Sequence, residues 1–286
     1  MENKIKIAIQ TKGRLNEDSM NLLNEAGIGL RMGKRVLVST AKNFPMDALF
    51  LRDDDIPQAV ADGVSDIGIV GENEMEEKGK EVVVIKRLGF SKCRLSLAIP
   101  KSIEYPGIEF FNGKKIATSY PLILKKYLDE HNISADIHVI TGSVEIAPGI
   151  GLADAIFDIV SSGSTLVSNR LKEVEVVMQS EAVLIANPNL SPEKKAILDE
   201  LIFRIESVER AKGKKYILLN IPNGKIQEVI DILPGMKAPT LVPLAKEGWS
   251  SMHSVIEENH FWEIIGKLKK AGAEGILVVP IEKMIF

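Results

Sequence analysis

The amino-acid sequence predicts an α/β protein with two lobes and a third, smaller domain at its C-terminal end. Two successive series of short apolar strands, each with its turns and helices, predict the two lobes. A charged crossover segment, Lys86 to Leu88, separates the two series. After Gly213 the order of elements becomes βαββαβ, which is typical of a ferredoxin-like domain.

The composition is that of a globular protein with two or three domains. The 286 residues are 45% hydrophobic and 26% charged, and their net charge is −3, which gives no electrostatic footprint for nucleic acid or an anionic membrane. No apolar run approaches the roughly 20 residues that span a bilayer, and Met1 to Gln10 shows no leader pattern. The single cysteine, Cys93, excludes an internal disulfide. We therefore expect a cytoplasmic protein that binds neither nucleic acid nor membrane.

The first lobe begins with a strand from Lys4 to Gln10 and a turn that carries Lys12 and Arg14. Open α/β sheets bind ligands at the carboxyl ends of their strands, so these two cations are placed to meet anionic groups. The residues alone favour another interpretation, that they are solvated turn cations. A helix that runs through Ala26 follows, with Asn16 or Asp18 as its expected cap.

Carboxylates mark the rest of the first lobe. The run Asp53 to Asp55 resembles a metal site, but a simpler interpretation is that one aspartate caps a helix from Ile56 to Asp62. Pro57 suits the first turn of such a helix. The next strand, Val64 to Val70, is followed by Glu72, which can accept a hydrogen bond from an adenine amino group or a ribose hydroxyl. It can equally be an ordinary first-turn carboxylate.

The second lobe repeats the strand and helix pattern. Its turns place Tyr120 after one strand and the Gly/Ser segment Thr141 to Glu145 after the next. That segment, with Gly142, Ser143 and Glu145, is a candidate cradle for an anion or a ribose. Around the crossover and in this lobe, strands are expected at 82–85, 94–98, 115–118 and 135–140.

The stretch Glu145 to Leu166 carries the strongest functional signal. Its apolar run, residues 155–160, suits a buried strand, and the turn after it contains Ser161, Ser162, Gly163, Ser164 and Thr165. A strand that leads through such a turn into a helix points backbone N–H groups and hydroxyls at one spot, which favours a phosphate. An ordinary capped turn uses the same residue types. Asp154 and Asp158, just upstream, could hold sugar hydroxyls or Mg²⁺, so the combination indicates a sugar phosphate.

The remaining chain returns to the first lobe and then forms the third domain. An amphipathic helix is expected from about Pro192 to Lys212, and Gly213 ends it. The return strands are expected at 174–178 and 181–187. In the third domain we expect strands at 216–221, 240–245, 250–256 and 275–280, and helices at 225–233 and 262–271.

The spacing of residues in the central stretch resembles the signature of the ATP phosphoribosyltransferase family. The matching positions are Glu145, Gly151, Ala153, Ile156, Asp158, Ile159, Ser162, Gly163, Thr165 and Leu166. Further blocks agree over essentially the whole chain: QTKGRL from Gln10, RDDDIP from Arg52, DIGIVGEN from Asp66, CRLSLA from Cys93, IATSYP from Ile116 and PIEKM from Pro280. The resemblance is to the long form of this family.

The resemblance implies a fold and a reaction. The fold is a two-lobed catalytic part like the type II periplasmic-binding proteins, plus a C-terminal ferredoxin-like, ACT-like regulatory domain. The expected boundaries are 1–92 with 181–212 for lobe I, 93–180 for lobe II and 213–286 for the regulatory domain. The reaction is transfer of the phosphoribosyl group of phosphoribosyl pyrophosphate to N1 of ATP, with release of pyrophosphate, as the first step of histidine biosynthesis.

The resemblance also implies roles for the candidate residues. Asp154 and Asp158 would be catalytic, and residues Ser161 to Thr165 would bind phosphoribosyl pyrophosphate with Mg²⁺. ATP would be bound by Lys12, Arg14, Glu72, Tyr120, Gly142, Ser143 and Glu145. Histidine would be a feedback inhibitor that contacts Met236, Thr240 and Gly275. The chain would form homo-oligomers, a hexamer with dimer forms.

Two other classes of function compete with this interpretation. A bilobal binding protein would share the two lobes and the crossover, but it explains neither the absence of a leader pattern nor the added βαββαβ domain. A silent regulatory subunit would be expected to lose the Ser/Gly turn, which is intact at Ser161 to Thr165.

Overall fold

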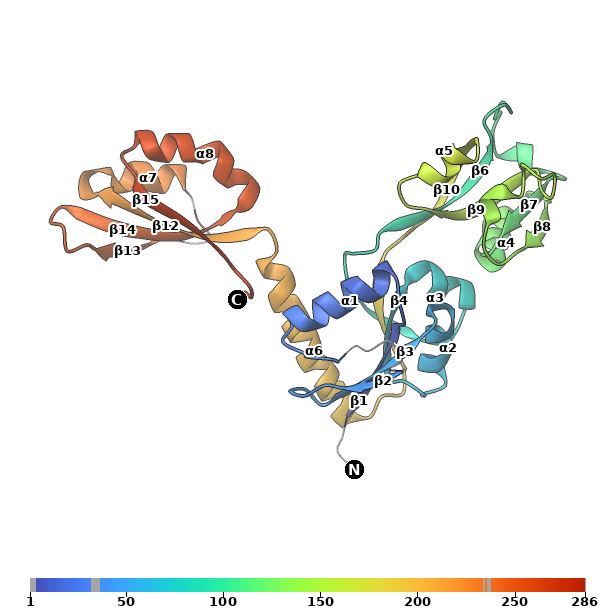
Figure 1. Cartoon of the computed structure of the whole chain (residues 1–286), viewed down its shortest axis with the longest axis horizontal. Helices are drawn as coiled ribbons and strands as arrows, with labels where there is room; N and C mark the ends of the chain where they lie inside the picture. Colours follow the sequence, from blue (N-terminus) through green and yellow to red (C-terminus); the bar gives the residue numbers. More distant parts are fainter. Residues whose placement is uncertain (1–3, 32–36, 234, 236–237, 286) are drawn as a thin grey trace. The chain divides into compact units, whose positions relative to one another are not determined.

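The computed structural model describes residues 4–31, 37–233, 235 and 238–285. These residues form three β-sheets, with six, five and four strands (Figure 1). The chain divides into two compact units, residues 28–198 with 1–24, and residues 199–286 with 25–27. The first unit holds the six-stranded and five-stranded sheets, which with their helices we call lobe I and lobe II. The α/β class predicted from the sequence is confirmed.

Lobe I is built on a six-stranded sheet with the strand order β2-β3-β1-β4-β11-β5. Its elements are β1 (Ile5–Gln10), α1 (Arg14–Glu25), β2 (Val38–Thr40), β3 (Met46–Leu51), the 3₁₀ turn η1 (Asp53–Asp55), α2 (Ile56–Ala61), β4 (Ile67–Gly71), α3 (Glu72–Lys78), β5 (Val83–Arg87) and β11 (Ala182–Ala186). Strands β3, β1 and β4 are parallel, and β11 runs antiparallel between β4 and β5. Strand β4 is buried from Ile67 to Val70, as expected for a central strand covered on both faces.

Helix α2 packs closely on β4 because Gly68 has no side chain. A Cβ at this position would stand 2.7 Å from Cγ2 of Ile56 and 3.0 Å from Cγ2 of Val60. Both of those side chains are fully buried. A substitution at Gly68 would therefore push α2 away from the sheet.

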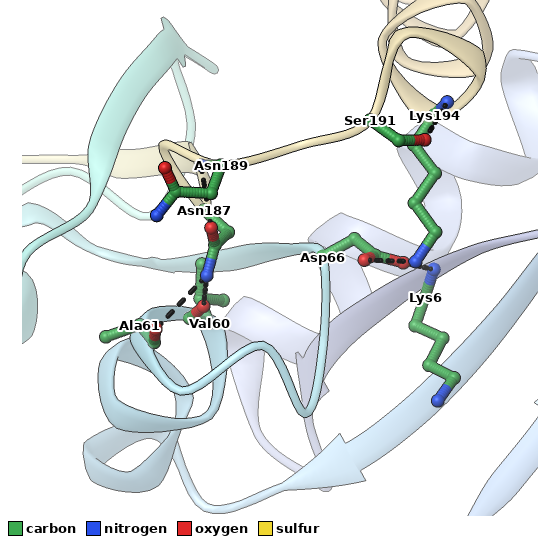
Figure 2. Close-up of polar contacts among 8 residues, drawn as sticks. All are labelled: Lys6, Val60, Ala61, Asp66, Asn187, Asn189, Ser191 and Lys194. Atoms are coloured by element: carbon green, nitrogen blue, oxygen red, sulfur yellow. Dashed lines mark hydrogen bonds and ion pairs between the residues drawn. The ribbon is translucent and has the colours of Figure 1, made fainter.

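Asp66, just before β4, ties the returning chain to lobe I. Its carboxylate accepts a hydrogen bond from the backbone N–H of Lys6 and pairs with Nζ of Lys194, each at 2.7 Å (Figure 2). Asn187, which follows β11, donates its amide to the carbonyls of the last two residues of α2. These contacts lie at the amino ends of β1 and β4, away from the strand ends where ligands bind in such sheets.

Lobe II is built on a five-stranded sheet with the strand order β10-β6-β9-β7-β8. Its elements are β6 (Cys93–Pro100), η2 (Ile108–Phe111), β7 (Lys115–Thr118), α4 (Pro121–Glu130), β8 (Asp136–Val139), η3 (Val144–Ile146), β9 (Ala155–Val160), α5 (Ser164–Ser168) and β10 (Leu171–Ser180). Strands β8, β7 and β9 are parallel, β6 is antiparallel to β9, and β10 is antiparallel to β6. The arrangement repeats that of β3-β1-β4-β11-β5 in lobe I.

Each face of the lobe II sheet has its own apolar cluster. Leu95, Leu97 and Phe157 pack with α4 on one face. Ile156 and Val160, which alternate with Phe157 along β9, pack on the other face near α5. The sheet is thus a rigid support for the loops at its edges.

The two lobes meet through side chains of α3 as well as through the two chain crossings. The backbone N–H of Asn73 donates to Oγ of Ser180 at 3.0 Å, and that hydroxyl donates back to Oδ1 of Asn73 at 2.8 Å. The carboxylate of Glu77 accepts hydrogen bonds from the N–H groups of Leu122 and Ile123, at 2.9 and 3.0 Å. A carboxylate of lobe I therefore caps the first turn of α4 in lobe II.

The C-terminal part confirms the predicted βαββαβ order. Its elements are α6 (Pro192–Ala211), β12 (Lys214–Pro222), η4 (Asn223–Lys225), α7 (Ile226–Ile232), β13 (Thr240–Pro243), β14 (Trp249–Glu257), α8 (Glu258–Lys270) and β15 (Glu274–Pro280). The sheet order is β13-β14-β12-β15, and α7 and α8 cover one face of it (Figure 1). Ile217, Leu219 and Met252 are buried under these helices. None of the helices in the described ranges is long and apolar enough to cross a bilayer.

Two local expectations, both about helix caps, are wrong. Helix α1 already begins at Arg14, so Asn16 does not cap it and instead donates its side-chain amide to the carbonyl of Gln10. The three aspartates form the 3₁₀ turn η1, and Asp55 precedes α2 without a side-chain capping bond. Helix α5 has only five residues because Arg170 adopts a left-handed conformation (φ 56°) and Leu171 starts β10.

Candidate active site

The Ser/Gly loop lies at the carboxyl end of β9, between that strand and α5. Gly163 has φ 80° and directly precedes α5, a conformation that glycine adopts without strain. The hydroxyls of Ser162 and Ser164 lie 3.0 Å apart, and the backbone N–H of Ser164 points to Oγ of Ser162 at 3.4 Å. Both serines and Thr165 are exposed. The loop therefore presents a group of hydroxyl and N–H donors that suits a phosphate.

Asp158 lies on β9 two residues before the end of the strand and is only partly exposed. Its Oδ1 accepts a hydrogen bond from the N–H of Ile159 at 2.8 Å. Burial, together with the nearby charge of Glu145, raises the pKa of the Asp158 carboxyl to about 6. The group is thus ionised at neutral pH but binds a proton more readily than an ordinary aspartate.

Asp154 does not join this group. It precedes β9, and its Oδ2 accepts a hydrogen bond from the N–H of Lys115 at the amino end of β7, at 2.9 Å. At about 3.3 Å per residue, the strand holds it about 20 Å from the Ser161 turn. The catalytic role expected for Asp154 stays a prediction, and in this structure its carboxylate joins the start of β9 to the start of β7.

The ends of the neighbouring strands β7 and β8 bring further candidates to the same edge. Gly142 (φ 83°) and Ser143 (φ 52°) form a left-handed turn after β8, and Glu145 follows in η3. Tyr120 follows β7, and its backbone N–H donates to Oγ1 of Thr118 at 2.8 Å. Since β8, β7 and β9 are adjacent and parallel, these segments and the Ser/Gly loop share one edge of lobe II.

The hydroxyl of Tyr120, in lobe II, forms hydrogen bonds with two residues of lobe I. It donates to Oε1 of Glu74 on α3 at 2.7 Å and accepts from Nδ2 of Asn73 at 3.2 Å. Burial and the charge of Glu74 raise the pKa of the Tyr120 phenol, and burial also raises that of the Glu74 carboxyl. The Tyr120 hydroxyl is thus committed to the junction of the two lobes, and its ring is buried in the apolar cluster under α4.

Lobe I contributes three candidates from the carboxyl ends of β1 and β4. Lys12 and Arg14 follow β1, and both are exposed. Arg14 lies 3.8 Å from the carboxylate of Asp18 within α1. Glu72 follows β4 and pairs with Arg87, the last residue of β5. Because β1 pairs with β4, the three candidates share one edge of the lobe I sheet.

Arg94 is a residue at this site to which sequence reasoning gave no role. Its guanidinium donates to the carbonyl of Ser161 at 3.1 Å and to both carboxylate oxygens of Glu173, at 2.5 and 2.6 Å. The sequence contains no local signal for these contacts, because the partners are 67 and 79 residues away. Asn73, Glu74 and Glu77, which join the lobes, were missed for the same reason.

A metal site built by the protein alone is not evident in the described ranges. There, no three His, Cys, Asp or Glu side chains gather closely enough to hold an ion. Near the loop, the charge of Glu145 contributes to the raised pKa of Asp158, so these two carboxylates lie close enough to interact. The donor set thus fits a metal only if a ligand supplies the remaining oxygens.

The candidates for histidine binding are separated within the C-terminal sheet. Thr240 begins the edge strand β13, where it pairs with His253 of β14. Gly275 lies on β15 at the opposite edge, with φ 57°, close to Asn220 of β12. Met236 lies outside the described residues. One sheet therefore does not bring Thr240 and Gly275 together.

Comparison with known proteins agrees over the whole length of the chain. Residues 52–207 match the model of the ATP phosphoribosyltransferase family, and residues 211–283 match the model of its C-terminal domain. An ATP phosphoribosyltransferase of Parabacteroides distasonis is 69% identical over 98% of this chain and 99% of its own length. One from Cytophaga hutchinsonii is 62% identical over the full length of both chains.

A solved structure is similar as well. The ATP phosphoribosyl transferase (HisG:HisZ) complex from Thermotoga maritima contains a chain that aligns with a TM-score of 0.61 and 29% identity. The alignment covers 98% of that chain and 71% of this one. The site geometry and these comparisons converge, and the chain belongs to the ATP phosphoribosyltransferase family.

Proposed function

We propose that the lobe II edge holds phosphoribosyl pyrophosphate for the reaction of this family, the first step of histidine biosynthesis. In that reaction the phosphoribosyl group passes to N1 of ATP and pyrophosphate leaves. The observation that carries the proposal is the exposed donor group of Ser161 to Thr165 directly above Asp158, at the carboxyl end of a central strand. The loop binds the 5-phosphate, and Asp158 contacts the ribose.

The chemistry needs positioning and electrostatics rather than a protein nucleophile. Adenine N1 is a neutral nucleophile, so the ATP nitrogen attacks the anomeric carbon as the bond to pyrophosphate breaks. Positive charge develops on the ribose ring, and the Asp158 carboxylate, ionised above its pKa of about 6, stabilises that charge. Glu145 lies near enough to support the same role and to contact a ribose hydroxyl.

ATP is proposed to bind across the edges of both lobes. Lys12 and Arg14 offer exposed cations to its phosphates, and Glu72 offers an acceptor to adenine or ribose. Gly142 and Ser143 contribute the turn after β8, and Tyr120, which is buried, contributes through its bond to Glu74 rather than through an exposed surface. The bond between Tyr120 and Glu74 supports this arrangement, because it joins the two edges.

Mg²⁺ is proposed to arrive with pyrophosphate oxygens rather than at a site that the protein builds alone. The described residues do not gather three metal ligands, which favours a substrate-borne ion. When bound, the ion supplies charge neutralisation to the leaving group. Asp158 and Glu145 are the protein carboxylates closest to such an ion.

Regulation and assembly remain proposals as well. We propose a division into lobe I at 1–92 with 181–212, lobe II at 93–180 and a regulatory domain at 213–286 that binds histidine. Thr240 and Gly275 stand at opposite edges of one sheet, so a shared histidine site would need two copies of the chain. This requirement is consistent with the proposed hexamer and dimer forms, and the enzyme is proposed to act in the cytoplasm.

The test is an ultraviolet assay with ATP, phosphoribosyl pyrophosphate and Mg²⁺, which follows the absorbance change on alkylation of adenine N1. A signal that needs all three components and falls with added histidine would support both the site and the regulatory proposal. A signal that histidine does not change would contradict the proposed inhibition by histidine but would still support the transferase activity. Folded protein that binds ATP but gives no signal would contradict the proposed catalytic site.

A further inference from the structure

Arg94 stands where three segments of lobe II meet. It is the second residue of β6, the strand that brings the chain into this lobe. Glu173 lies near the start of β10, the strand that leads the chain back to lobe I. Ser161 is the first residue of the Ser/Gly loop. One guanidinium contacts all three segments, because its fork of donors can reach several acceptors at once.

The pair of Arg94 and Glu173 has the geometry of a strong interaction. The guanidinium donates through Nε to one carboxylate oxygen at 2.5 Å and through a terminal nitrogen to the other at 2.6 Å. Ser96 adds a third hydrogen bond, from its hydroxyl to Oε1 of Glu173 at 2.6 Å. These bonds lower the pKa of the Glu173 carboxyl, with Arg94 as the largest cause. The Glu173 carboxyl of the folded protein is therefore ionised at neutral pH.

The remaining donor of Arg94 fixes the base of the loop. Its other terminal nitrogen donates to the carbonyl of Ser161 at 3.1 Å. A peptide unit is planar, so holding this carbonyl also fixes the direction of the following N–H, which belongs to Ser162. Beyond it, Ser162, Ser164 and Thr165 are exposed and carry donors proposed for the 5-phosphate.

The same network lies beside Asp158. Ser96 on β6 and Asp158 on β9 are register partners, so their side chains are on the same face of the sheet. Arg94 and Val160 are the next such pair toward the loop. The hydrogen bonds of Arg94, Glu173 and Ser96 thus run along the strand neighbouring Asp158 and end at the loop.

We propose that Arg94, held by Glu173 and Ser96, is a positioning residue that sets the orientation of the phosphoribosyl pyrophosphate loop. We call these three side chains the Arg94 clamp. It acts on one substrate, because its contact is with Ser161 and not with the lobe I residues proposed for ATP. This inference rests on the proposed role of the loop and adds the element that holds the loop in its binding geometry.

The decisive variants change the clamp without touching the loop. Glu173→Gln keeps the size of the side chain and removes its charge. It should raise KM for phosphoribosyl pyrophosphate about tenfold and leave KM for ATP within twofold of the wild-type value. Arg94→Lys keeps the positive charge but loses the fork, so it should show the same selective increase. The double variant Arg94→Lys with Glu173→Gln should be no worse than the poorer of the two single variants, because the clamp acts as one unit.

A matched control is Glu200→Gln, which removes the negative charge from an Arg–Glu pair of the same kind, with Arg204 at 2.8 Å on α6. It should change neither KM. An equal increase in both KM values, with a lower melting temperature, would show a merely structural role and overturn the proposal. So would wild-type KM for phosphoribosyl pyrophosphate in both Glu173→Gln and Arg94→Lys. If Arg94 variants fail to fold, Glu173→Gln decides.

Different results would contradict the proposed site and the Arg94 clamp. If wild-type protein gives no absorbance change with ATP, phosphoribosyl pyrophosphate and Mg²⁺, the proposed site fails. If the wild type is active and the clamp variants keep its KM for phosphoribosyl pyrophosphate, only the clamp fails. Calorimetric titration of each variant with the Mg²⁺ complex of phosphoribosyl pyrophosphate measures the binding step by itself.

Discussion

Lobe I and lobe II share a strand order but differ in what stands at the edge of the sheet. In both lobes three parallel strands are followed by an antiparallel strand and a further edge strand. Lobe II ends two of its parallel strands, β8 and β9, in Gly/Ser turns with the left-handed residues Gly142 and Gly163. In lobe I the turns after β1 and β4 carry the charged residues Lys12, Arg14 and Glu72, of which Glu72 pairs with Arg87, and the turn after β1 also contains a left-handed glycine, Gly13. Equal topology therefore presents different side chains at the two edges, because the turns and the last residues of the strands differ.

The largest expected effect of a substitution is at Asp158, on the lobe II edge. Asp158→Asn keeps the shape of the side chain but removes the charge that would stabilise the transition state. We expect kcat to fall by about 100-fold to 1,000-fold with little change in substrate binding. Its counterpart at the lobe I edge, Glu72→Gln, should mainly raise KM for ATP. Steady-state kinetics with each substrate varied would measure both, and a wild-type kcat for Asp158→Asn would contradict the assignment.

The same aspartate should cost stability, in a pH-dependent way. Its pKa is raised from 3.8 to about 6, so between these values the folded state binds more protons than the unfolded state. Stability conferred at low pH is lost as pH rises through 6, and the full cost above that pH is at most about 3 kcal/mol. Asp158→Asn should therefore melt at a higher temperature than wild type at pH 8, with the difference shrinking toward pH 4. A constant difference across that range would contradict the buried charge.

The sequence predicts those elements that are determined by residues close together in the chain. The βαββαβ order of the C-terminal part and the strand at residues 115–118 follow from local alternation and turn residues. Strands β2 and β3 were not predicted. β3, at Met46–Leu51, is a short segment that becomes a strand by pairing with β1, about 40 residues earlier in the chain. No local pattern announces such a pairing.

The site shows the same limit. The Ser/Gly loop and Asp158 could be proposed from residue types in one stretch, and they lie at one strand end. Asp154 belongs to the same stretch, but an extended strand carries it to the far edge. Spacing in sequence gives a distance along the chain and not a direction in the fold. Arg94 became visible only once the contacts to Ser161 and Glu173 were known.

A substitution inside the lobe I sheet should change stability but not the kinetics of the enzyme. Gly68→Ala places a methyl group 2.7 Å from Cγ2 of Ile56, so α2 must shift. We expect a loss of about 2 kcal/mol in the free energy of unfolding, with both KM values of the folded enzyme unchanged. Denaturant titration and steady-state kinetics would check this. Gly79→Ala is not a suitable control, because Gly79 has φ 54°. Gly224→Ala is better, because a Cβ there meets nothing within 4 Å and its φ is not in the left-handed region.

The smallest expected effect sharpens the comparison, because it lies where the lobes meet. Glu77 of lobe I accepts the N–H groups of Leu122 and Ile123 in lobe II. Glu77→Ala removes this cap and should lower the free energy of unfolding by about 1 kcal/mol. If ATP contacts both edges, a looser junction should also raise KM for ATP, by about twofold to fivefold. Loss of a cap within a single lobe would have no such reason to alter ATP binding.

Glu76→Ala is the matched control for this junction, since Glu76 lies on the same helix and is exposed. It should leave KM for ATP and the unfolding midpoint near their wild-type values. If Glu77→Ala lowers stability but leaves KM for ATP unchanged, the cap is structural and the nucleotide does not depend on the angle between the lobes. If Glu77→Ala raises KM for ATP and Glu76→Ala does not, ATP binding depends on how the two lobes are joined. The two sheet edges, which belong to lobes of the same topology, then act together on one substrate.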